Sequence, residues 1–353
     1  MRIRVIKRDD SSKFLQIAVP FIAIFLSFTF VGIFLFINGM NPLNVFKDMF
    51  VESLGSFYGL SEVLVKTTPL MLCGLGVALA FRMELWNIGA EGQLYMGAFG
   101  ASLVALFLKL DNHFLMILLM FLSAVFFSGL WGLIAGFLKA RWNVNEIIVT
   151  LLMNYIAILW VDYLVYGPWK DPAGFNFPLT KQFSDVARLS YYFNTRLHTG
   201  FFIALLLIFL FYILIEKTIW GYEIRVIGNN PNAAKYAGIN YEKNVILVMF
   251  ISGALAGIAG FSEVAGVTYR LQHSISPGYG YTAIIIAWLA KRSALGVLIV
   301  SFVMGVLFVG NDALQISYQL PVAFVNAFQG LILFFVISSE FFVNYKLRLE
   351  INK

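Results

Sequence analysis

Ionisable side chains inside long apolar runs are the residues of this chain whose chemistry points most directly to a binding role. A charge in hydrocarbon is unfavourable, so such residues are functional candidates. Glu263 lies deepest in an apolar run, whereas Glu91 and Glu146 lie near the ends of theirs. Glu263 can bind a solute hydroxyl or amine, or it can cap a broken helix, and we slightly favour the structural role.

Amide and tyrosine side chains in or beside the apolar runs extend this set. A path for a neutral polar solute needs uncharged hydrogen-bonding groups, because fixed charges would trap or exclude the solute. Hydrogen bonds between neighbouring helices are the better explanation of each amide when it is taken singly. The residues that we expect to line or shape a solute path are Asn87, Glu91, Gln93, Asn145, Glu146, Asn154, Glu263, Tyr279 and Tyr281.

Patterns typical of catalysis or metal binding are absent from the sequence. It contains no Walker A pattern, no G-x-S-x-G and no H-E-x-x-H motif. His113, His198 and His273 are scattered, and Cys73 is a single cysteine in an apolar run. We therefore predict no catalytic residue and no metal ligand, and uphill transport would draw its energy from another chain.

Composition places the chain in a lipid bilayer. Of its 353 residues, 60% are hydrophobic and 12% are charged, whereas soluble domains are about 25% charged. The basic residues give a net charge of +6 but follow the loops, so we expect no nucleic-acid partner. The first apolar run, 14–37, is long enough to span the bilayer and lacks a cleavage pattern, which predicts a retained helix.

Alternation of apolar runs and polar loops predicts an all-α polytopic membrane protein. About ten transmembrane helices are expected, some of them broken. The expected spans are 14–37, 63–81, 93–108, 114–138, 146–166, 200–216, 244–269, 278–290, 294–311 and 321–339.

The distribution of Lys and Arg predicts that both ends of the chain are cytoplasmic. Placing the basic N-terminal tail, residues 1–13, inside puts most of the 25 Lys and Arg residues on inner loops by alternation. The transmembrane domain is then 14–340, with a cytoplasmic loop at 217–243 and a cytoplasmic tail at 341–353.

Two substantial segments fall on the outer side in this topology. They are 38–62, which carries Gly, Asn and Pro, and 167–199, which is aromatic and interrupted by prolines. Each is either a structured cap over the bundle or a surface where an extracellular delivery protein lands.

Two further segments interrupt the apolar pattern at membrane depth. Residues 81–92, FRMELWNIGAEG, bring polar and Gly residues into the start of a helix. Residues 274–282, SISPGYGYT, precede a helix of only about 15 Å, half a bilayer. Broken helices often mark the substrate path of transporters. The alternative is two loops at the interface, although Lys291 and Arg292 after the short helix favour a crossing.

The polar insert GNNPNAAKYAGI at 228–239 lies between two long apolar runs. Pro231 at a first-turn position, an Ala-rich body and Gly238 past the end predict a short helix. Such a helix at the cytoplasmic end of a bundle is either a docking site for a soluble partner or an ordinary loop helix that reverses the chain.

Five motifs together resemble a known family. They are NIGAEGQLYMGA at 87–98, NVNEIIVTLLMNYIA at 143–157, GPWKDPAGFNFP at 167–178, the insert at 228–239 and SPGYGYTAI at 276–284. Their order and spacing resemble ABC-importer permeases of the branched-chain amino acid/ribose type. The phrase NIGAEGQ is most similar to the nucleoside and simple-sugar permeases that work with a BMP-family binding lipoprotein. Ala290 and Ser293 depart from the Gly and Asn-type residues expected in that turn.

The resemblance implies a type II-like ABC importer permease fold and a set of partners. These are an ABC ATPase subunit that holds ATP-Mg, a second permease subunit that is commonly a different chain, an extracellular solute-binding lipoprotein and a nucleoside substrate. The chain itself would lie in the cell membrane. This chain itself would bind no cofactor. The loop at 228–239 would be the coupling helix that fits the ATPase. Its expected contacts are Gly228, Asn229, Asn232, Ala233, Ala234, Tyr236, Ala237 and Gly238.

Three alternatives remain open on the sequence. A permease for ribose or another simple sugar lies within the same class. An ion-coupled carrier that works alone is a different class, although no relay of carboxylates and histidines is present to carry protons. A membrane scaffold with no transport role is the third.

Overall fold

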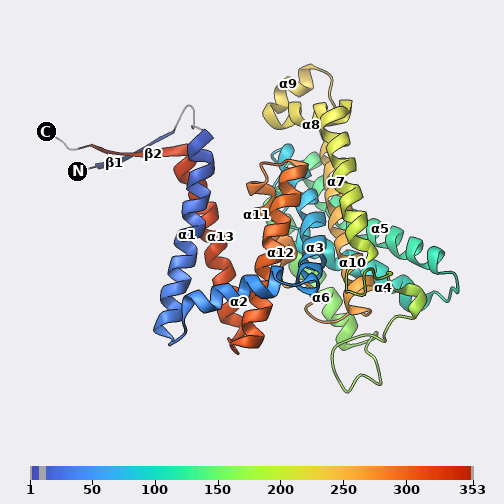
Figure 1. Cartoon of the computed structure of the whole chain (residues 1–353). Coiled ribbons are helices and arrows are strands. Elements are labelled where there is room, and N and C mark those ends of the chain that lie inside the picture. Colours follow the sequence, from blue (N-terminus) through green and yellow to red (C-terminus); the bar gives the residue numbers. More distant parts are fainter. Residues whose placement is uncertain (1, 8–12, 351–353) are drawn as a thin grey trace. The chain divides into compact units, whose positions relative to one another are not determined.

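The computed structural model describes residues 2–7 and 13–350 (Figure 1). Helices dominate these residues, which confirms the all-α expectation. The chain divides into two compact units, one formed by residues 1–59 and 306–353 and the other by residues 60–305.

The first unit brings the two ends of the chain together. Its elements are α1 (Lys13–Ile37), α2 (Pro42–Leu54), α13 (Val322–Asn344), β1 (Arg2–Lys7) and β2 (Tyr345–Glu350). Strands β1 and β2 pair antiparallel, with Arg2 opposite Glu350 and Lys7 opposite Tyr345. The predicted tails 1–13 and 341–353 therefore contribute the two strands of one small ribbon.

Helix α2 lies inside the segment 38–62, which the charge pattern predicts to be an outer segment without specifying its structure. Asn41 accepts a hydrogen bond from the backbone N–H of Leu43 at 3.0 Å, and Pro42 occupies the first turn. Both are favourable at a helix start. The axis of α2 turns by 119° from that of Ile22–Ile37, so α1 and α2 form a sharply bent pair.

The second unit contains the remaining helices, except that residues 57–59 of α3 and 306–317 of α12 belong to the first unit. Its elements are α3 (Phe57–Arg82), α4 (Ala90–Phe107), α5 (His113–Trp142), α6 (Glu146–Tyr166), η1 (Asp185–Ala187), α7 (Thr199–Lys217), α8 (Ile219–Asn229), α9 (Pro231–Tyr236), α10 (Tyr241–Glu263), the π-helical turn η2 (Val264–Thr268), α11 (Tyr279–Leu289) and α12 (Ala294–Ser317).

Every expected span coincides with a helix, but the expected number of ten crossings is not established. Among the described residues, six helices are long and apolar enough to span a membrane, or seven if the bent pair α1–α2 is one span. The six are α3, α5, α6, α7, α10 with η2, and α12. The predicted half-length helix is present as α11, which has 11 residues.

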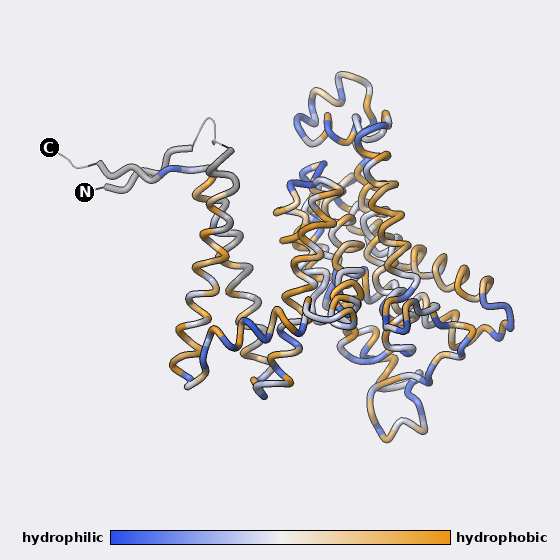
Figure 2. The backbone as a smooth tube through the Cα atoms, viewed as in Figure 1, coloured by the Kyte–Doolittle hydropathy of each residue, from blue (hydrophilic) through white to orange (hydrophobic). Residues whose placement is uncertain are grey.

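Close packing of α4 against α5 and α10 forms the core of the second unit. Nearly all of α4 is buried. A Cβ atom added to Gly97 would lie 2.3 Å from the backbone of Gly257, and one added to Gly253 would lie 2.6 Å from the carbonyl oxygen of Ser128. Small residues thus let the helix backbones touch, as is usual for helices packed in a membrane. Figure 2 shows the hydrophobic outer lengths of α5 and α7 and the hydrophilic loops at their ends.

Candidate functional site

The N-terminal ends of α4 and α11 meet inside the second unit. An irregular stretch, 83–89, precedes α4, and another, 269–278, precedes α11. A Cβ atom on Gly280 would lie 2.2 Å from the backbone nitrogen of Glu91, so no larger residue fits at this approach. The two segments predicted to interrupt helices therefore lead into one junction.

The carboxylate of Glu91 holds this junction. The backbone N–H of Gly280 donates to Glu91 Oε2 at 2.7 Å, and Tyr281 N–H and the Ser276 hydroxyl also bond to this carboxylate. Ser276 Oγ in turn accepts from the N–H of Tyr279 at 2.9 Å. The first N–H groups of a helix have no partner within it, and a carboxylate there also interacts favourably with the helix dipole. Glu91 and Ser276 thus cap α11 from the side of α4.

A second polar cluster joins the approach to α4 with α10. Asn87 donates to Gln93 Oε1 at 2.9 Å and to Ser252 Oγ at 2.8 Å, and Gln93 returns a bond to Asn87 Oδ1 at 3.1 Å. Ser252 donates to the carbonyl oxygen of Gly76 on α3 at 2.7 Å. All three side chains are buried. Their hydrogen bonds to one another satisfy polar groups that no water could reach inside a membrane.

Asn154 fastens the same region to α6. Its Oδ1 accepts from the N–H of Gly92 at 2.8 Å, and its Nδ2 donates to the carbonyl oxygen of Ile88 at 2.8 Å. The Tyr281 hydroxyl lies 3.5 Å from Nδ2 and its side chain is 37% exposed. Tyr279, by contrast, is buried. Of the two tyrosines, Tyr281 is therefore the one that is partly exposed.

Two other residues assigned to the path lie at the N-terminal end of α6, away from Asn154. Asn145 is exposed and caps the helix by accepting from the N–H of Ile147 at 2.9 Å. Glu146 is buried and pairs with Lys139 Nζ at 3.0 Å. The structure therefore gives both residues clear local bonds at the helix start.

Glu263 ends α10 just before the π-helical turn, and it is buried. The charges of Lys66 and Arg196 act on it. Arg196 also pairs with Glu62 at 3.2 Å, and the other carboxylate oxygen of Glu62 is buried without a hydrogen bond. This charged cluster is separate from the Glu91 junction.

Several residues of these clusters were not singled out by the sequence analysis. Ser252 completes the cluster of Asn87 and Gln93, Ser276 completes the cap of α11, and Glu62 and Arg196 complete the charged cluster near Glu263. A serine within an apolar helix or a capping position gives only a weak signal in sequence. The partnership of Glu62 with Arg196 joins residues 134 positions apart, which no local pattern can show.

The predicted short helix at 228–239 is confirmed as α9. Asn230 accepts from the N–H groups of Asn232 and Ala233 at 3.0 and 3.1 Å, and Gly238 has φ +77° just past the end. Ala234 is fully buried, whereas Tyr236 is 94% exposed. Figure 1 shows α8 and α9 at one end of this unit, opposite the loop that follows α6.

Of the other residues expected to contact an ATPase, most are accessible. Asn229, Asn232, Ala233 and Ala237 are exposed. Gly228 is partly buried, because a Cβ atom on it would lie 2.1 Å from the carbonyl oxygen of Arg82. Gly228 therefore seats α8 directly on the end of α3.

Arg225 of α8 belongs to a network of ion pairs and one hydrogen bond that includes the ends of α7 and α3 and the turn between α11 and α12. Glu216 at the end of α7 pairs with Arg82 at 3.0 Å and with Arg225 of α8 at 2.8 Å. Arg82 Nε donates to the carbonyl oxygen of Arg292 at 3.0 Å, and Arg292 pairs with Glu84 at 2.8 Å. A displacement of α8 and α9 would thus reach α3, α7 and the turn between α11 and α12.

The turn at 290–293, where the sequence departs from the expected residues, is well bonded. Ser293 Oγ donates to the carbonyl oxygen of Ala290 at 2.8 Å and accepts from the N–H of Gly296 at 3.1 Å. Ser293 therefore serves both the end of one helix and the start of the next.

At the opposite end, the loop after α6 pairs with the segment that leads into α11. Thr180 N–H donates to the carbonyl oxygen of Leu271 at 2.9 Å, and Phe183 N–H donates to that of Tyr269 at 2.8 Å. His273 Nδ1 lies 2.7 Å from Asp162 Oδ1. The loop is thus tied to the same segment that Glu91 holds at its inner end.

A bundle of long apolar helices, interrupted at an internal junction and carrying a short exposed helix on one end, is the architecture of a polytopic membrane protein. The chain belongs to the family described as branched-chain amino acid transport system / permease component, which matches residues 59–337. It is therefore a transport subunit of the ABC class, in which the ATPase is a separate chain.

Three relatives are similar over nearly their whole length. The glucose ABC transporter permease protein TsgB13 of Haloferax volcanii is 35% identical, over 96% of this chain and 92% of its own. The guanosine ABC transporter permease protein NupP of Bacillus subtilis is 33% identical, over 92% and 94%. The nucleoside ABC transporter permease protein NupB of Lactococcus lactis is 30% identical, over 92% of each. Membership in this family excludes the ion-coupled carrier as the class of this chain.

Proposed function

We propose that this chain is the permease subunit of an ATP-driven importer of nucleosides. Its similarity to two permeases named for guanosine and for nucleosides, over at least 92% of each relative, is the observation that carries the proposal. The buried amides around Asn87 and Asn154 agree with it, because a nucleoside is neutral and polar and would be hindered by fixed charges.

In this proposal the solute passes beside the Glu91 junction. The carboxylate itself is occupied by the start of α11. We assign direct contact with solute to Tyr281 and a supporting role to Asn87, Gln93 and Asn154, which hold the junction in place. Asn145, Glu146, Tyr279 and Glu263 then shape the ends and walls of the path.

The proposed partners follow the two ends of the second unit. An ABC ATPase that holds ATP-Mg would dock on α9, and a solute-binding lipoprotein would dock on the opposite end, where 167–199 lies. A second permease subunit, a different chain in this proposal, would complete the path. Both termini would be cytoplasmic in the cell membrane, with 217–243 as the coupling loop.

Uptake of labelled guanosine and uridine tests the proposal, in cells with and without this gene. Uptake that disappears on deletion, returns with the gene and resists excess unlabelled glucose or ribose is the expected result. Depletion of ATP should stop it, whereas an ionophore at constant ATP should not. Unchanged nucleoside uptake in a deletion strain without a second nucleoside importer would reject the assignment.

A simple sugar is the second candidate substrate, because the relative with 35% identity is a glucose permease. In the same strains, labelled glucose and ribose would then lose uptake on deletion while guanosine would not. The two candidates share the permease class and the coupling end and differ only in solute.

A further inference from the structure

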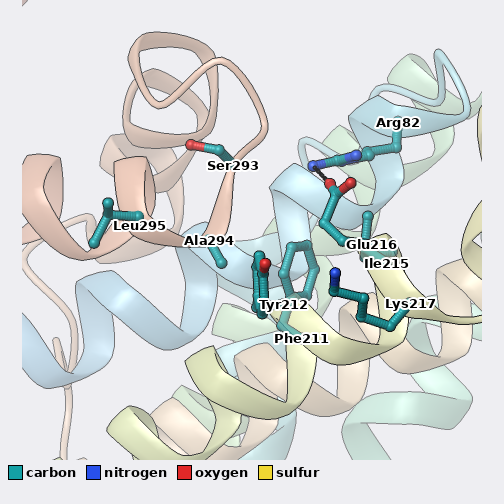
Figure 3. Close-up of a pocket in the computed structure, with 9 residues that line it drawn as sticks. All are labelled: Arg82, Phe211, Tyr212, Ile215, Glu216, Lys217, Ser293, Ala294 and Leu295. Carbon is teal, nitrogen blue, oxygen red and sulfur yellow. Dashed lines mark ion pairs between the residues drawn. The ribbon is translucent and has the colours of Figure 1, made fainter.

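A cavity lies beside the ion pairs that anchor α8. Its volume is about 350 Å³, within the range of small-ligand sites. The residues lining it are Arg82, Phe211, Tyr212, Ile215, Glu216, Lys217, Ser293, Ala294 and Leu295. All belong to the second unit, and Figure 3 shows the rings of Phe211 and Tyr212 beside the Arg82–Glu216 pair.

The cavity combines an apolar wall with a positively charged edge. Of its lining residues, Phe211 and Ile215 are buried, and Tyr212 and Leu295 are 47% and 65% exposed. Arg82 and Arg225 share the single carboxylate of Glu216, so this group keeps one positive charge. Lys217 adds another, and among the described residues it has no ion pair.

The cavity also lies at the ends of two long apolar helices, the place where a bilayer would change from hydrocarbon to headgroups. It is formed by the last turns of α7, an apolar helix of 19 residues, and the first residues of α12, which is also long enough to cross a membrane. Tyrosines and snorkelling lysines are typical of this depth. Basic sites between transmembrane helices on the cytoplasmic side bind anionic headgroups.

We propose that this cavity binds an anionic glycerophospholipid, with the phosphate at Lys217 and Arg82 and an acyl chain along Phe211, Tyr212 and Leu295. The net positive charge selects an anionic over a zwitterionic lipid. The location in the cytoplasmic leaflet rests on the orientation in the proposed function, whereas the binding chemistry does not. Because Glu216 also holds Arg225 of α8, the bound lipid would brace the corner that carries α9.

Native mass spectrometry of the purified, delipidated transporter complex, titrated with phosphatidylglycerol or phosphatidylcholine, tests this proposal. We expect bound phosphatidylglycerol and much weaker phosphatidylcholine. Lys217→Gln should weaken phosphatidylglycerol binding about fivefold, since one basic residue near an anionic surface contributes about 1 kcal/mol. Lys217→Arg should retain binding, and Leu295→Trp should weaken it by filling the groove without changing charge.

The matched control is Lys243→Gln, which removes an exposed lysine from the start of α10. It should bind phosphatidylglycerol like the wild type, and thermal unfolding should show that all variants are folded. Equal binding of the two lipids, or full binding by both Lys217→Gln and Leu295→Trp, would overturn the proposal. Displacement of phosphatidylglycerol by inorganic phosphate alone would also overturn it. The absence of any lipid binding, because another subunit covers the cavity, would do the same. None of these outcomes depends on which solute is transported.

Discussion

Glu91 illustrates how a buried charge can serve structure in a transport protein. Its position in NIGAEGQ predicted a residue that lines or shapes the path. In the structure its carboxylate is bonded to the backbone N–H groups of Gly280 and Tyr281 in the first turn of α11, about 190 residues away in sequence. A carboxylate bound by several donors needs no solute to satisfy it, so we infer that Glu91 fixes the short helix that presents Tyr281.

Replacing Glu91 with Ala should therefore destabilise the protein as well as reduce uptake. Each hydrogen bond to a charged group contributes about 1.5–3 kcal/mol, and the orphaned N–H groups would remain buried. Glu91→Gln keeps one acceptor oxygen and should lose less. The midpoint of thermal unfolding of the purified protein measures both effects.

The control for this comparison is Glu242→Ala. Glu242 pairs with Arg141 at 3.2 Å, but both side chains are about half exposed. Such pairs contribute about 0–1 kcal/mol, so little change is expected. An equal, small loss from Glu91→Ala and Glu242→Ala would contradict the capping role.

His198 predicts a dependence of stability on pH at the start of α7. Burial lowers the pKa of His198 to about 4, with a further contribution from the charge of Arg196, and its neutral Nδ1 accepts from the N–H of Gly200 at 3.2 Å. The unfolded chain, with a pKa of about 6.5, binds more protons than the folded protein below that pH. The contribution of neutral His198 to the free energy of unfolding is therefore fully present above about pH 6.5. It is lost as the pH falls toward 4, by roughly 3 kcal/mol in total.

Unfolding midpoints measured between pH 7.5 and 4.5 test this expectation. His198→Asn keeps a side-chain acceptor for the helix start and should flatten the profile. His113→Asn removes an exposed histidine and serves as the matched control. If the wild type and His198→Asn lose stability in parallel, the burial of a neutral His198 is not the cause.

At the scale of elements, much of the fold was predictable because its signals are local. A helix is present at every span that an apolar run predicts, and Pro231 and Gly238 predicted the end of α9 to within one residue. Helix α2 was missed because its amphipathic, partly charged sequence falls below the apolar pattern of a span. The contacts of Glu91, Asn154 and Arg196 could not be predicted, since they depend on the packing of distant helices.

Helix α9 should couple ATP hydrolysis to transport through Tyr236, which extends into solvent. Tyr236→Ala should leave the unfolding midpoint unchanged, because surface substitutions usually shift stability by less than about 0.5 kcal/mol. Uptake should nevertheless fall at least about tenfold when the ATPase loses this contact. Ala234→Lys places a charge in a buried position and should instead unfold α9.

Tyr163→Ala is the matched control for this pair. It removes a tyrosine that is 62% exposed on α6 and far from α9 in sequence. Uptake and co-purification of the ATPase, measured at equal expression, should be normal in Tyr163→Ala and impaired in Tyr236→Ala. Normal uptake in both would place the docking surface elsewhere.

The membrane topology of the whole molecule rests on both the charge pattern and the structure. The positive loops predict which end is cytoplasmic, and the structure places α9 and the loop after α6 at opposite ends of the second unit (Figure 1). The natural sequence is well suited to a direct test, because its single cysteine, Cys73, is fully buried.

In a Cys73→Ala background, single cysteines at the two ends should react from opposite sides of the membrane. Lys235→Cys lies on α9, and Phe175→Cys replaces a side chain that is 93% exposed in the loop after α6. A membrane-impermeant maleimide should label Phe175→Cys in intact cells or right-side-out vesicles, and Lys235→Cys only in inside-out vesicles or after permeabilisation. The reverse pattern would invert the topology and move the ATPase site away from α9. Labelling of both from one side would mean that the chain between them, which contains α7, does not cross the membrane. The alternation of positive loops requires that it crosses once.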